Sequence, residues 1–444
     1  MRLSVPILVS LFLMPAASAL GAERFALPKF KSGYELPPLE VPPAASDALE
    51  YLDVAALAVA LALASYLALR ARSRRALWVL MAASLVYFGF YRGGCICSIG
   101  AIQNVALALL DNGYAIPFTA VAFFVIPLAV TLLFGRTFCA AVCPLGALQD
   151  IVAVRPVRVP AWLDHGLGLL AYVYLGAAVL FAATGAAFLI CEYDPFVAIF
   201  RLVPFTRPNA MMEAFGGSMG MLVLGAGFVL VGLFIARPYC RWLCPYGAML
   251  RLLSRASKWH VTITPDECVH CTLCEDSCPF NAIQKPTTDL PRPDRPIDRR
   301  RLALLLILVP LLLAGGGCFG RWLGEPFSRV HFTVQQAERV RLEETGRITG
   351  TDDISDAFYK TQRPREELYA EADAIRGRFD IGGTLLGVWV GLVVAVKLIH
   401  LSVYRTRPDY EPDRATCLSC GRCFKYCPVE RKRLKTLKGE PTTP

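Results

Sequence analysis

Charged side chains are scarce in this sequence: Asp, Glu, Lys and Arg make up only 18% of its 444 residues, whereas 55% are hydrophobic. A soluble protein of this length normally carries more charge, so the composition excludes an ordinary soluble globular protein and indicates apolar surface that faces lipid. The net charge of +10 is poor evidence for nucleic-acid binding, because Lys and Arg gather beside apolar stretches, where they orient membrane helices.

Motifs of the common enzyme classes are also missing. The sequence has no Walker motif, no dinucleotide-binding glycine pattern placed after a strand, and no Ser–His–Asp arrangement. Chemistry at a bound substrate is therefore not supported. Histidine is scarce, with five in the chain; only His400 lies clearly within an apolar stretch, and His165 lies at the edge of another. A haem held by these two is conceivable, but packed histidines are far commoner.

Cysteine, in contrast, is abundant: the chain has 16. Eight of them form two copies of the spacing Cys-x2-Cys-x2-Cys-x3-Cys-Pro. The first copy uses Cys268, Cys271, Cys274 and Cys278, and the second uses Cys417, Cys420, Cys423 and Cys427. In two-cluster ferredoxins the first three thiolates of each copy bind one iron–sulfur cube, and the fourth ligates the other cube.

This spacing predicts two [4Fe–4S] clusters with crossed ligands. Cys427 would complete the cluster of the first copy, and Cys278 would complete the cluster of the second. The alternative is two separate Zn sites, but Zn motifs usually have two Cys-x2-Cys pairs with a longer gap between them.

Seven apolar stretches are long enough to predict membrane-spanning helices. They cover residues 54–69, 76–91, 116–134, 167–190, 217–236, 302–317 and 381–404. Arg70, Arg72, Arg74 and Arg75 follow the first stretch and predict a cytoplasmic loop there. Alternation then places the mature N-terminus outside and the C-terminus, with both ferredoxin motifs, in the cytoplasm.

The first 19 residues have the pattern of a secretory signal, with Arg2, an apolar run and the small residues Ala17-Ser18-Ala19. Cleavage after Ala19 is expected; the alternative is an uncleaved anchor. The signal also places the mature N-terminus outside, in agreement with the arginine pattern.

A second group of cysteines occupies an internal repeat, in which residues 135–148 match residues 236–249. Arg, both Cys, Pro, Gly and Ala coincide in the two copies, and the thiols are Cys139, Cys143, Cys240 and Cys244. Cysteines at i and i+4 share one helical face, so the repeat could bring all four together. Four soft thiolates favour an Fe–S cluster or another thiophilic metal; the alternative is buried structural cysteine.

Three further cysteines, Cys95, Cys97 and Cys191, fall at the expected outer face, with Asp194 nearby. They could form either a second redox station or a disulfide, because that compartment is oxidising. Cys318 stands alone at the end of the sixth stretch and is expected to be structural.

The predicted fold is an all-α polytopic membrane bundle of about seven helices, with an internal repeat of helix pairs and a small cytoplasmic two-cluster ferredoxin-like module. The predicted organisation is a signal peptide (1–19), an exported Pro-rich lead-in (20–53), a transmembrane repeat domain (54–260), a first ferredoxin half-motif (261–301), two transmembrane helices with an exported loop at 319–380 (302–404), and a second ferredoxin half-motif (405–444).

The ferredoxin motifs and the paired Cys-x3-Cys-Pro segments together resemble the polyferredoxin family that includes the NapH and NosR proteins. The resemblance runs from about residue 54 to the C-terminus. It implies an inner-membrane electron-transfer protein that serves a periplasmic reductase, with the eight ferredoxin cysteines as [4Fe–4S] ligands. NosR-like members also carry an exported domain with flavin attached through a Thr; no matching attachment motif is found here, so a partner would supply any flavin.

The expected function is an electron relay, as a subunit rather than a stand-alone enzyme. The donor would be the cytoplasmic side or the quinol pool, and the acceptor a periplasmic redox protein, which could bear flavin. The alternative is a membrane-bound reductase that assists maturation of a respiratory metalloenzyme. Such a factor becomes dispensable once its client is mature, whereas a relay is needed throughout respiration.

Overall fold

The computed structural model describes residues 47–94, 97–111, 113–154, 156–201, 219–263, 268–287, 295–403 and 405–438. The expected signal segment, most of the lead-in and Cys95 lie outside these ranges. Regular structure is almost all helical, which confirms the helical class. The elements before the ferredoxin motifs are α2 (Asp47–Leu69), α3 (Arg74–Ser84), the π-helix η1 (Leu85–Tyr91), α4 (Ser98–Leu110), α5 (Phe118–Phe134), α6 (Thr137–Ala141), α7 (Pro144–Val152), α8 (Ala161–Leu167), α9 (Leu170–Ala183), α10 (Leu189–Glu192), α11 (Pro195–Arg201), α13 (Met219–Phe234), α14 (Pro238–Trp242) and α15 (Pro245–Ser254).

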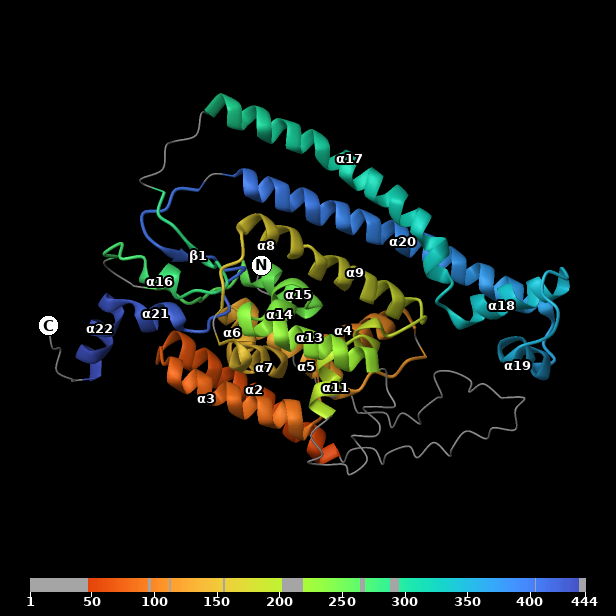
Figure 1. The fold of residues 1–444 in the computed structure, drawn as a ribbon, viewed down its shortest axis with the longest axis horizontal. Helices are drawn as coiled ribbons and strands as arrows, with labels where there is room; N and C mark the ends of the chain where they lie inside the picture. Colours follow the sequence, from red (N-terminus) through yellow and green to blue (C-terminus); the bar gives the residue numbers. More distant parts are fainter. Residues whose placement is uncertain are drawn as a thin grey trace, which may run out of the picture.

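The remaining elements build a small module, a long helical hairpin and a cap. They are α16 (Leu273–Asp276), β1 (Ile283–Gln284), α17 (Arg295–Ser328), α18 (Phe332–Glu344), α19 (Asp353–Thr361), α20 (Arg365–Ser402), β2 (Glu411–Pro412), α21 (Arg422–Tyr426) and α22 (Pro428–Lys438). Figure 1 shows the module of α16, β1, α21 and α22 at one end of the bundle and the cap of α18 and α19 at the other.

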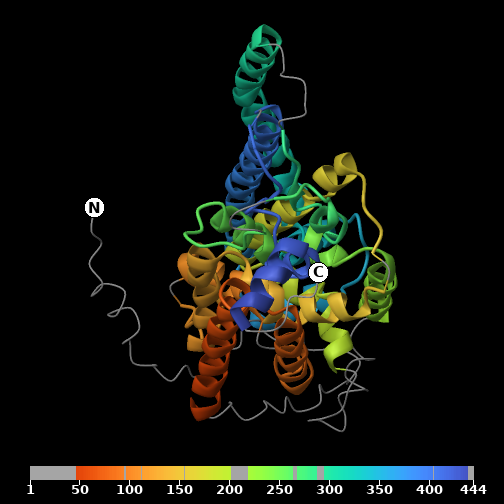
Figure 2. The same ribbon diagram turned by 90° about the vertical axis from the view of Figure 1, so that its left-hand side faces the viewer.

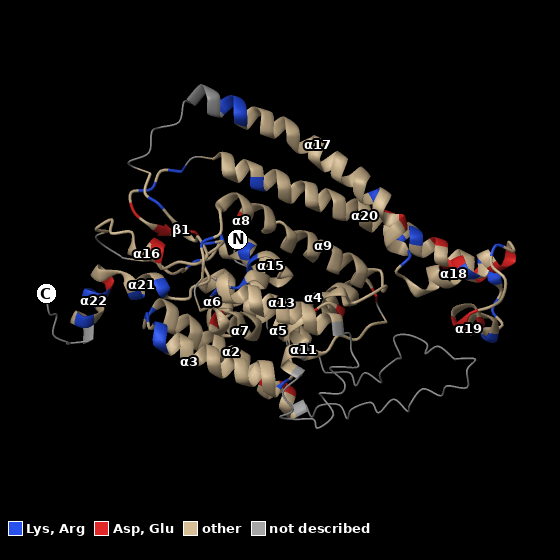
Figure 3. Ribbon diagram, viewed as in Figure 1, with Lys and Arg blue, Asp and Glu red and all other residues tan. Residues whose placement is uncertain are grey.

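Among the described residues, four helices are long and apolar enough to cross a membrane. They are Ala48–Leu69, Ala161–Ala183, Arg299–Ser328 and Arg365–Ser402, and three shorter apolar helices accompany them. Six of these seven helices coincide with predicted stretches. The remaining predicted stretch, 76–91, is divided between α3 and η1. Figure 3 shows that charged residues gather at the two ends of the molecule and are sparse along the middle of the long helices. Such a distribution is that of a membrane protein.

Helix α4 has no counterpart among the apolar stretches predicted from the sequence. It is one of the shorter apolar helices, and it lies against α5 and α9 with Ile99 and Ile102 buried. Its Gln103 is fully buried, and the side-chain oxygen accepts hydrogen bonds from the backbone N–H groups of Ile190 and Cys191 at 2.9 and 3.2 Å. Thus α4 fixes the segment that carries Cys191.

Helices α17 and α20 form a hairpin whose contact surface is made of glycine. Gly316 and Gly320 of α17 face Gly383, Gly387 and Gly391 of α20, so closely that a methyl group on Gly387 would overlap the carbonyl oxygen of Gly316. Small residues spaced by four allow membrane helices to approach at backbone distance. Figures 1 and 2 show the pair running together along one side of the bundle.

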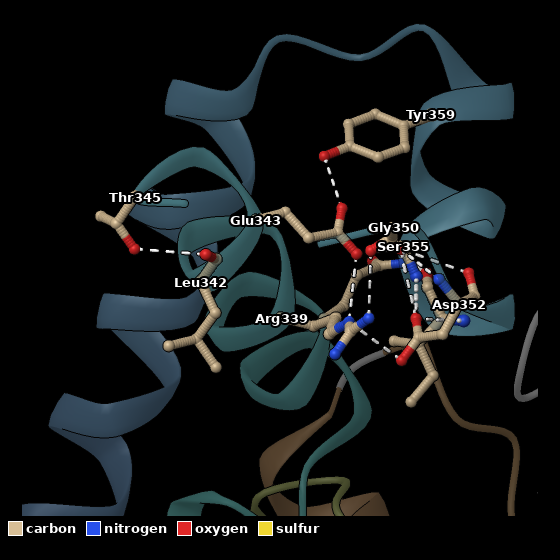
Figure 4. Close-up of polar contacts among 10 residues, drawn as sticks. Arg339, Leu342, Glu343, Thr345, Gly350, Asp352, Ser355 and Tyr359 are labelled. Carbon is tan, nitrogen blue, oxygen red and sulfur yellow. Dashed lines mark hydrogen bonds and ion pairs between the residues drawn. The ribbon is translucent and has the colours of Figure 1, made fainter. Parts of the chain in front are cut away.

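The cap is held by its own small core and a polar network. Val334 and Phe358 are buried in the core. In the network (Figure 4), Arg339 pairs with Glu343 at 3.0 Å, and Glu343 accepts hydrogen bonds from Ser355 at 2.6 Å and Tyr359 at 3.0 Å. These contacts make the segment between α17 and α20 an ordered unit.

The module at the opposite end is assembled from two distant segments of the chain. Strands β1 and β2 pair antiparallel, with Ile283 opposite Pro412 and Gln284 opposite Glu411. The Asp413 N–H also donates to the Ala282 carbonyl at 2.7 Å. The hairpin therefore returns the chain to the place it left, beside the first ferredoxin motif.

Candidate iron–sulfur centres

The first thiol group combines both ferredoxin motifs. Cys268, Cys271, Cys274 and Cys427 line one small cavity. His270 and Thr272 adopt left-handed backbone conformations, with φ of 50° and 62°, which wind the loop around this cavity. The structure thus places the fourth cysteine of the second motif with the first three of the first motif.

The second thiol group has the reciprocal composition. Cys278 lies within electrostatic range of Cys417, Cys420 and Cys423. Backbone N–H groups of Phe280, Ala282 and Ile283 point to the Cys278 sulfur, and the Ser419 N–H donates to the Cys417 sulfur at 3.4 Å. Such N–H···S contacts stabilise sulfur that carries negative charge.

The bare thiols of this module hold their protons tightly. Burial, together with neighbouring Cys268, Cys271 and Cys427, raises the pKa of Cys274 to about 11. Burial likewise raises the pKa of Cys417 to about 12. Thiolates crowded in this way require positive charge from metal, which displaces the protons when it binds. Two groups of four thiols with N–H donors around them fit [4Fe–4S] clusters.

A different set of donors also surrounds Cys268. Its sulfur, His270 and Asp409 offer ligand atoms within 4.8 Å of one another, and His270 Nε2 lies 3.4 Å from Asp409. Three donors leave a structural Zn site one short, and Cys268 already belongs to the first thiol group. The contact with Asp409 gives His270 a partner within the module.

The third thiol group brings together the four cysteines of the repeated segments. Cys143 lies within electrostatic range of Cys139, Cys240 and Cys244. In each copy a five-residue helix is followed by a cysteine that caps the next helix, which begins with Pro144 or Pro245. Proline suits the first helical position because no N–H is needed there. The Gly247 N–H donates to the Cys244 sulfur at 3.2 Å.

Two buried arginines connect the third thiol group with the module. The sequence showed them only as a matched pair in the repeat and did not predict a place for them beside the thiols. Arg237 is fully buried and interacts with Cys139, Cys240 and Cys420. Arg136, 2% exposed, donates to the Ala415 carbonyl at 3.1 Å and lies 3.7 Å from the Cys139 sulfur. Their recurrence at the same distance before each first cysteine is the signal that could have revealed them.

Asp150, also missed from the sequence, joins three elements around these arginines. Its buried carboxylate lies 2.8 Å from Arg74 of α3, 3.1 Å from Arg422 of α21 and 3.5 Å from Arg237 of α14. Next to it, the Gln149 side chain donates to the Cys240 sulfur at 3.3 Å. A lone carboxylate among so many basic residues gives no pattern that sequence reasoning could use.

The other cysteines and histidines named in the sequence analysis lie in three places. Cys97 and Cys191 line one cavity of about 320 Å³ with Asp194, and no disulfide joins cysteines within the described ranges. Cys97 also lines a small cavity with Cys143 and interacts with Cys244. His165 and His400 line another cavity, between α8 and α20. Cys318 is exposed on α17.

Comparison with known proteins agrees with this geometry. A 4Fe-4S binding domain family matches residues 116–163 and 218–264, which contain the third thiol group, and a second 4Fe-4S binding domain family matches residues 261–284. No solved structure is significantly similar to the chain.

Three curated relatives illustrate the similarity. Protein NirI of Paracoccus denitrificans is 32% identical over 167 residues, which cover 35% of this chain and 23% of NirI. Regulatory protein NosR of Pseudomonas aeruginosa is 28% identical over 46% of this chain and 29% of NosR. Methylamine utilization ferredoxin-type protein MauN of Methylobacillus flagellatus is 27% identical over 42% of this chain and 63% of MauN. The chain thus spans less than two thirds of each.

Apolar helices, clustered thiols and 4Fe-4S domains together define a membrane-bound iron–sulfur electron-transfer protein. Within that class, the chain is similar to the NosR/NirI-like membrane ferredoxin-type proteins.

Proposed function

We propose that the protein holds two [4Fe–4S] clusters with crossed ligands. The first three cysteines of each motif would bind one cluster, and Cys427 and Cys278 would complete the opposite ones. The placement of each fourth cysteine supports this pairing. A bound cluster would supply one-electron redox chemistry. The chain's own N–H donors, aimed at the sulfurs, would set how readily each cluster accepts charge.

We propose further that the third thiol group binds an additional Fe–S cluster or thiophilic metal and extends the electron path into the membrane. The observation that carries this proposal is a series of electrostatic interactions that links the second thiol group, the third thiol group and Cys97. Arg237 interacts with Cys420 of the second thiol group and with Cys240 of the third, and Cys244 interacts with Cys97. A bilayer of about 30 Å is too thick for one electron step, so intermediate stations are needed.

Cys97 and Cys191 would form the far end of this path, either as a redox station or as a disulfide that exchanges electrons. Their cavity with Asp194 supports the first role. Buried Arg136 and Arg237 would offset the negative charge of the thiolates in the second and third thiol groups.

The proposed topology has seven spans with parallel helix-pair repeats, the mature N-terminus outside, and the ferredoxin module in the cytoplasm. The Arg residues after α2 support this orientation. The cap of α18 and α19 would then face the periplasm and offer an ordered surface to a redox partner, which could bear flavin. The donor would be a cytoplasmic protein or quinol. The names of the relatives, which include methylamine utilization, are compatible with service to an exported enzyme.

Anaerobic purification of the full chain, with counts of iron and labile sulfide and EPR after stepwise reduction, tests these proposals. Two clusters predict about eight irons per chain, and an occupied third group predicts more. In the second case the variant Cys139→Ala/Cys240→Ala should lose the excess, while Cys318→Ala should keep it. An iron count near eight per chain that is the same in both variants would contradict a metal in the third thiol group. Little iron, or zinc in its place, would contradict the relay as a whole.

A further inference from the structure

A cavity of about 500 Å³ lies beside the third thiol group, bounded by α8, α9, α15, α20 and the loop before the second ferredoxin motif. It is lined by six cationic side chains and two carboxylates. The cations are Arg136, Arg237, Arg241, Arg251, Arg255 and Lys397, and the acids are Asp164 and Asp413. Nothing in the electron path uses Arg251, Arg255 or Lys397.

The cations of this cavity repel one another. Arg251 interacts unfavourably with Arg136, and Lys397 interacts unfavourably with Arg251 and Arg255. Like charges gathered in partly buried surroundings destabilise a fold unless an anion lies among them. Asp164 is already engaged by Arg241, whose Nε lies 2.5 Å from it. Asp150, which does not line the cavity, pairs with Arg237 at 3.5 Å. Asp164 and Asp413 still face five other cations, so the protein's own acids do not balance the lining.

Several of these arginines also keep unused hydrogen-bond donors. Arg241 is only 6% exposed; its Nη1 donates to the Pro279 carbonyl at 3.0 Å. Within the described part of the chain, nothing accepts a hydrogen bond from Arg241 Nη2, Arg251 Nε or Arg136 Nε. Buried donors without partners are costly, so they indicate a ligand rich in acceptor oxygens.

One side of the cavity is apolar and faces outward. Leu392, Val396 and Leu401 of α20 line it and are exposed, at the end of a helix long enough to span a membrane. Trp389 also lines it and donates to the Tyr172 carbonyl at 3.0 Å. A ligand entering here would have an anionic head and an apolar body.

We propose that this cavity binds the headgroup of an anionic phospholipid. The phosphodiester would lie among Arg251, Arg255 and Lys397, and the acyl chains would follow the exposed apolar face of α20. Basic pockets between membrane helices bind such lipids. A neutral quinone would satisfy some donors but would leave the excess positive charge unbalanced. Because the cavity is also lined by Arg136, Arg237 and the Ala415–Leu418 loop, the lipid would tie the module to the bundle.

Native mass spectrometry of the delipidated full chain tests this proposal with four probes: dioleoylphosphatidylglycerol, phosphatidylcholine, inorganic phosphate and decylubiquinone. We expect tight retention of the phosphatidylglycerol alone. In Arg255→Gln/Lys397→Gln its affinity should fall roughly tenfold, because two charge-assisted contacts are lost. Among the described residues, neither side chain makes a hydrogen bond whose loss would disturb the fold, so circular dichroism should be unchanged.

The matched control is Arg341→Gln/Arg347→Gln, two exposed arginines of the cap, which should bind phosphatidylglycerol as the parent does. Equal binding of phosphatidylcholine, or unchanged binding in the first double variant, would overturn the proposal. Saturation by inorganic phosphate would reassign the cavity to a free anion. Displacement of the phospholipid by decylubiquinone, with phosphate ineffective, would reassign it to a quinone.

Discussion

The hairpin of α17 and α20 and the bundle that contains the thiols bury very different groups. In the hairpin, the contact is backbone against backbone along the glycines of both helices, and only 6% of the apolar window of α17 is buried, against 39% for α2. The bundle instead encloses charged side chains, with Arg136 and Arg237 2% and 0% exposed, together with Asp150 and the third thiol group.

This difference indicates two kinds of stability. Close glycine contact depends on shape alone and needs no other part of the protein. Buried charges are tolerable only while every partner is present, since removing one leaves the others desolvated and unpaired. The stability of the hairpin should therefore depend on side-chain volume at its glycines, and the stability of the bundle on the charge of its buried side chains. The predictions that follow test this contrast, from the largest expected effect to the smallest.

Cys427→Ala should have the largest effect, because it removes a ligand from a group of four. We expect a loss of about four irons per chain, with the spectrum of Cys427→Ala matching that of Cys271→Ala. EPR of the reduced proteins makes the comparison, with Cys318→Ala on the hairpin as the unaffected control. If Cys427→Ala instead matched Cys420→Ala, the crossed pairing would be wrong.

Arg237→Gln should destabilise the bundle by about 3–5 kcal/mol, because it removes one partner of a buried ion pair. Asp150 would keep Arg74 and Arg422, but the region between Cys139 and Cys420 would keep only Arg136 of its two buried arginines. Thermal unfolding in detergent measures the change. The comparison is Arg376→Gln in the hairpin, where the ion pairs with Asp373 and Glu338 are partly exposed and the cost should stay below about 1 kcal/mol. Equal losses would contradict the contrast between the regions.

Gly387→Leu should separate α17 from α20, because its side chain would occupy the position of the Gly316 carbonyl. Overpacking of this kind costs about 1–3 kcal/mol. Increased proteolysis of the cap in the membrane-inserted protein reports the separation. Gly377→Leu lies on the same helix with nothing near its Cβ position and should resemble the parent. Similar sensitivity in both variants would show that the glycines do not hold the hairpin.

Tyr359→Phe should have the smallest effect, since it removes one hydrogen bond to Glu343 and leaves the other contacts of the cap in place. The expected loss is about 1 kcal/mol, measured by thermal unfolding, with iron content unchanged. A loss of iron in this variant would mean that the cap communicates with the thiol groups.

The sequence predicted the apolar helices and the thiol motifs well, because length, hydropathy and cysteine spacing are local properties. It missed α4 because a mostly apolar helix of thirteen residues is too short to span a bilayer and can equally be a buried helix. From the sequence, the arginines beside the apolar stretches were interpreted only as residues that orient the membrane helices. Burial of Arg136 and Arg237, and their meeting with Asp150, depend on contacts between segments far apart in sequence, which no local pattern encodes.

The pairing of β1 with β2 has a consequence for biosynthesis. The two strands belong to segments separated by both helices of the hairpin, so the ribosome must complete α20 before Gln284 can meet Glu411. Chains are made from the N-terminus and fold as they emerge. The first motif must therefore wait, with its loop unclosed, until translation is nearly finished. A nascent chain would therefore leave the first motif open until α20 has been inserted and β2 has been made. A chain truncated before β2 would never close it.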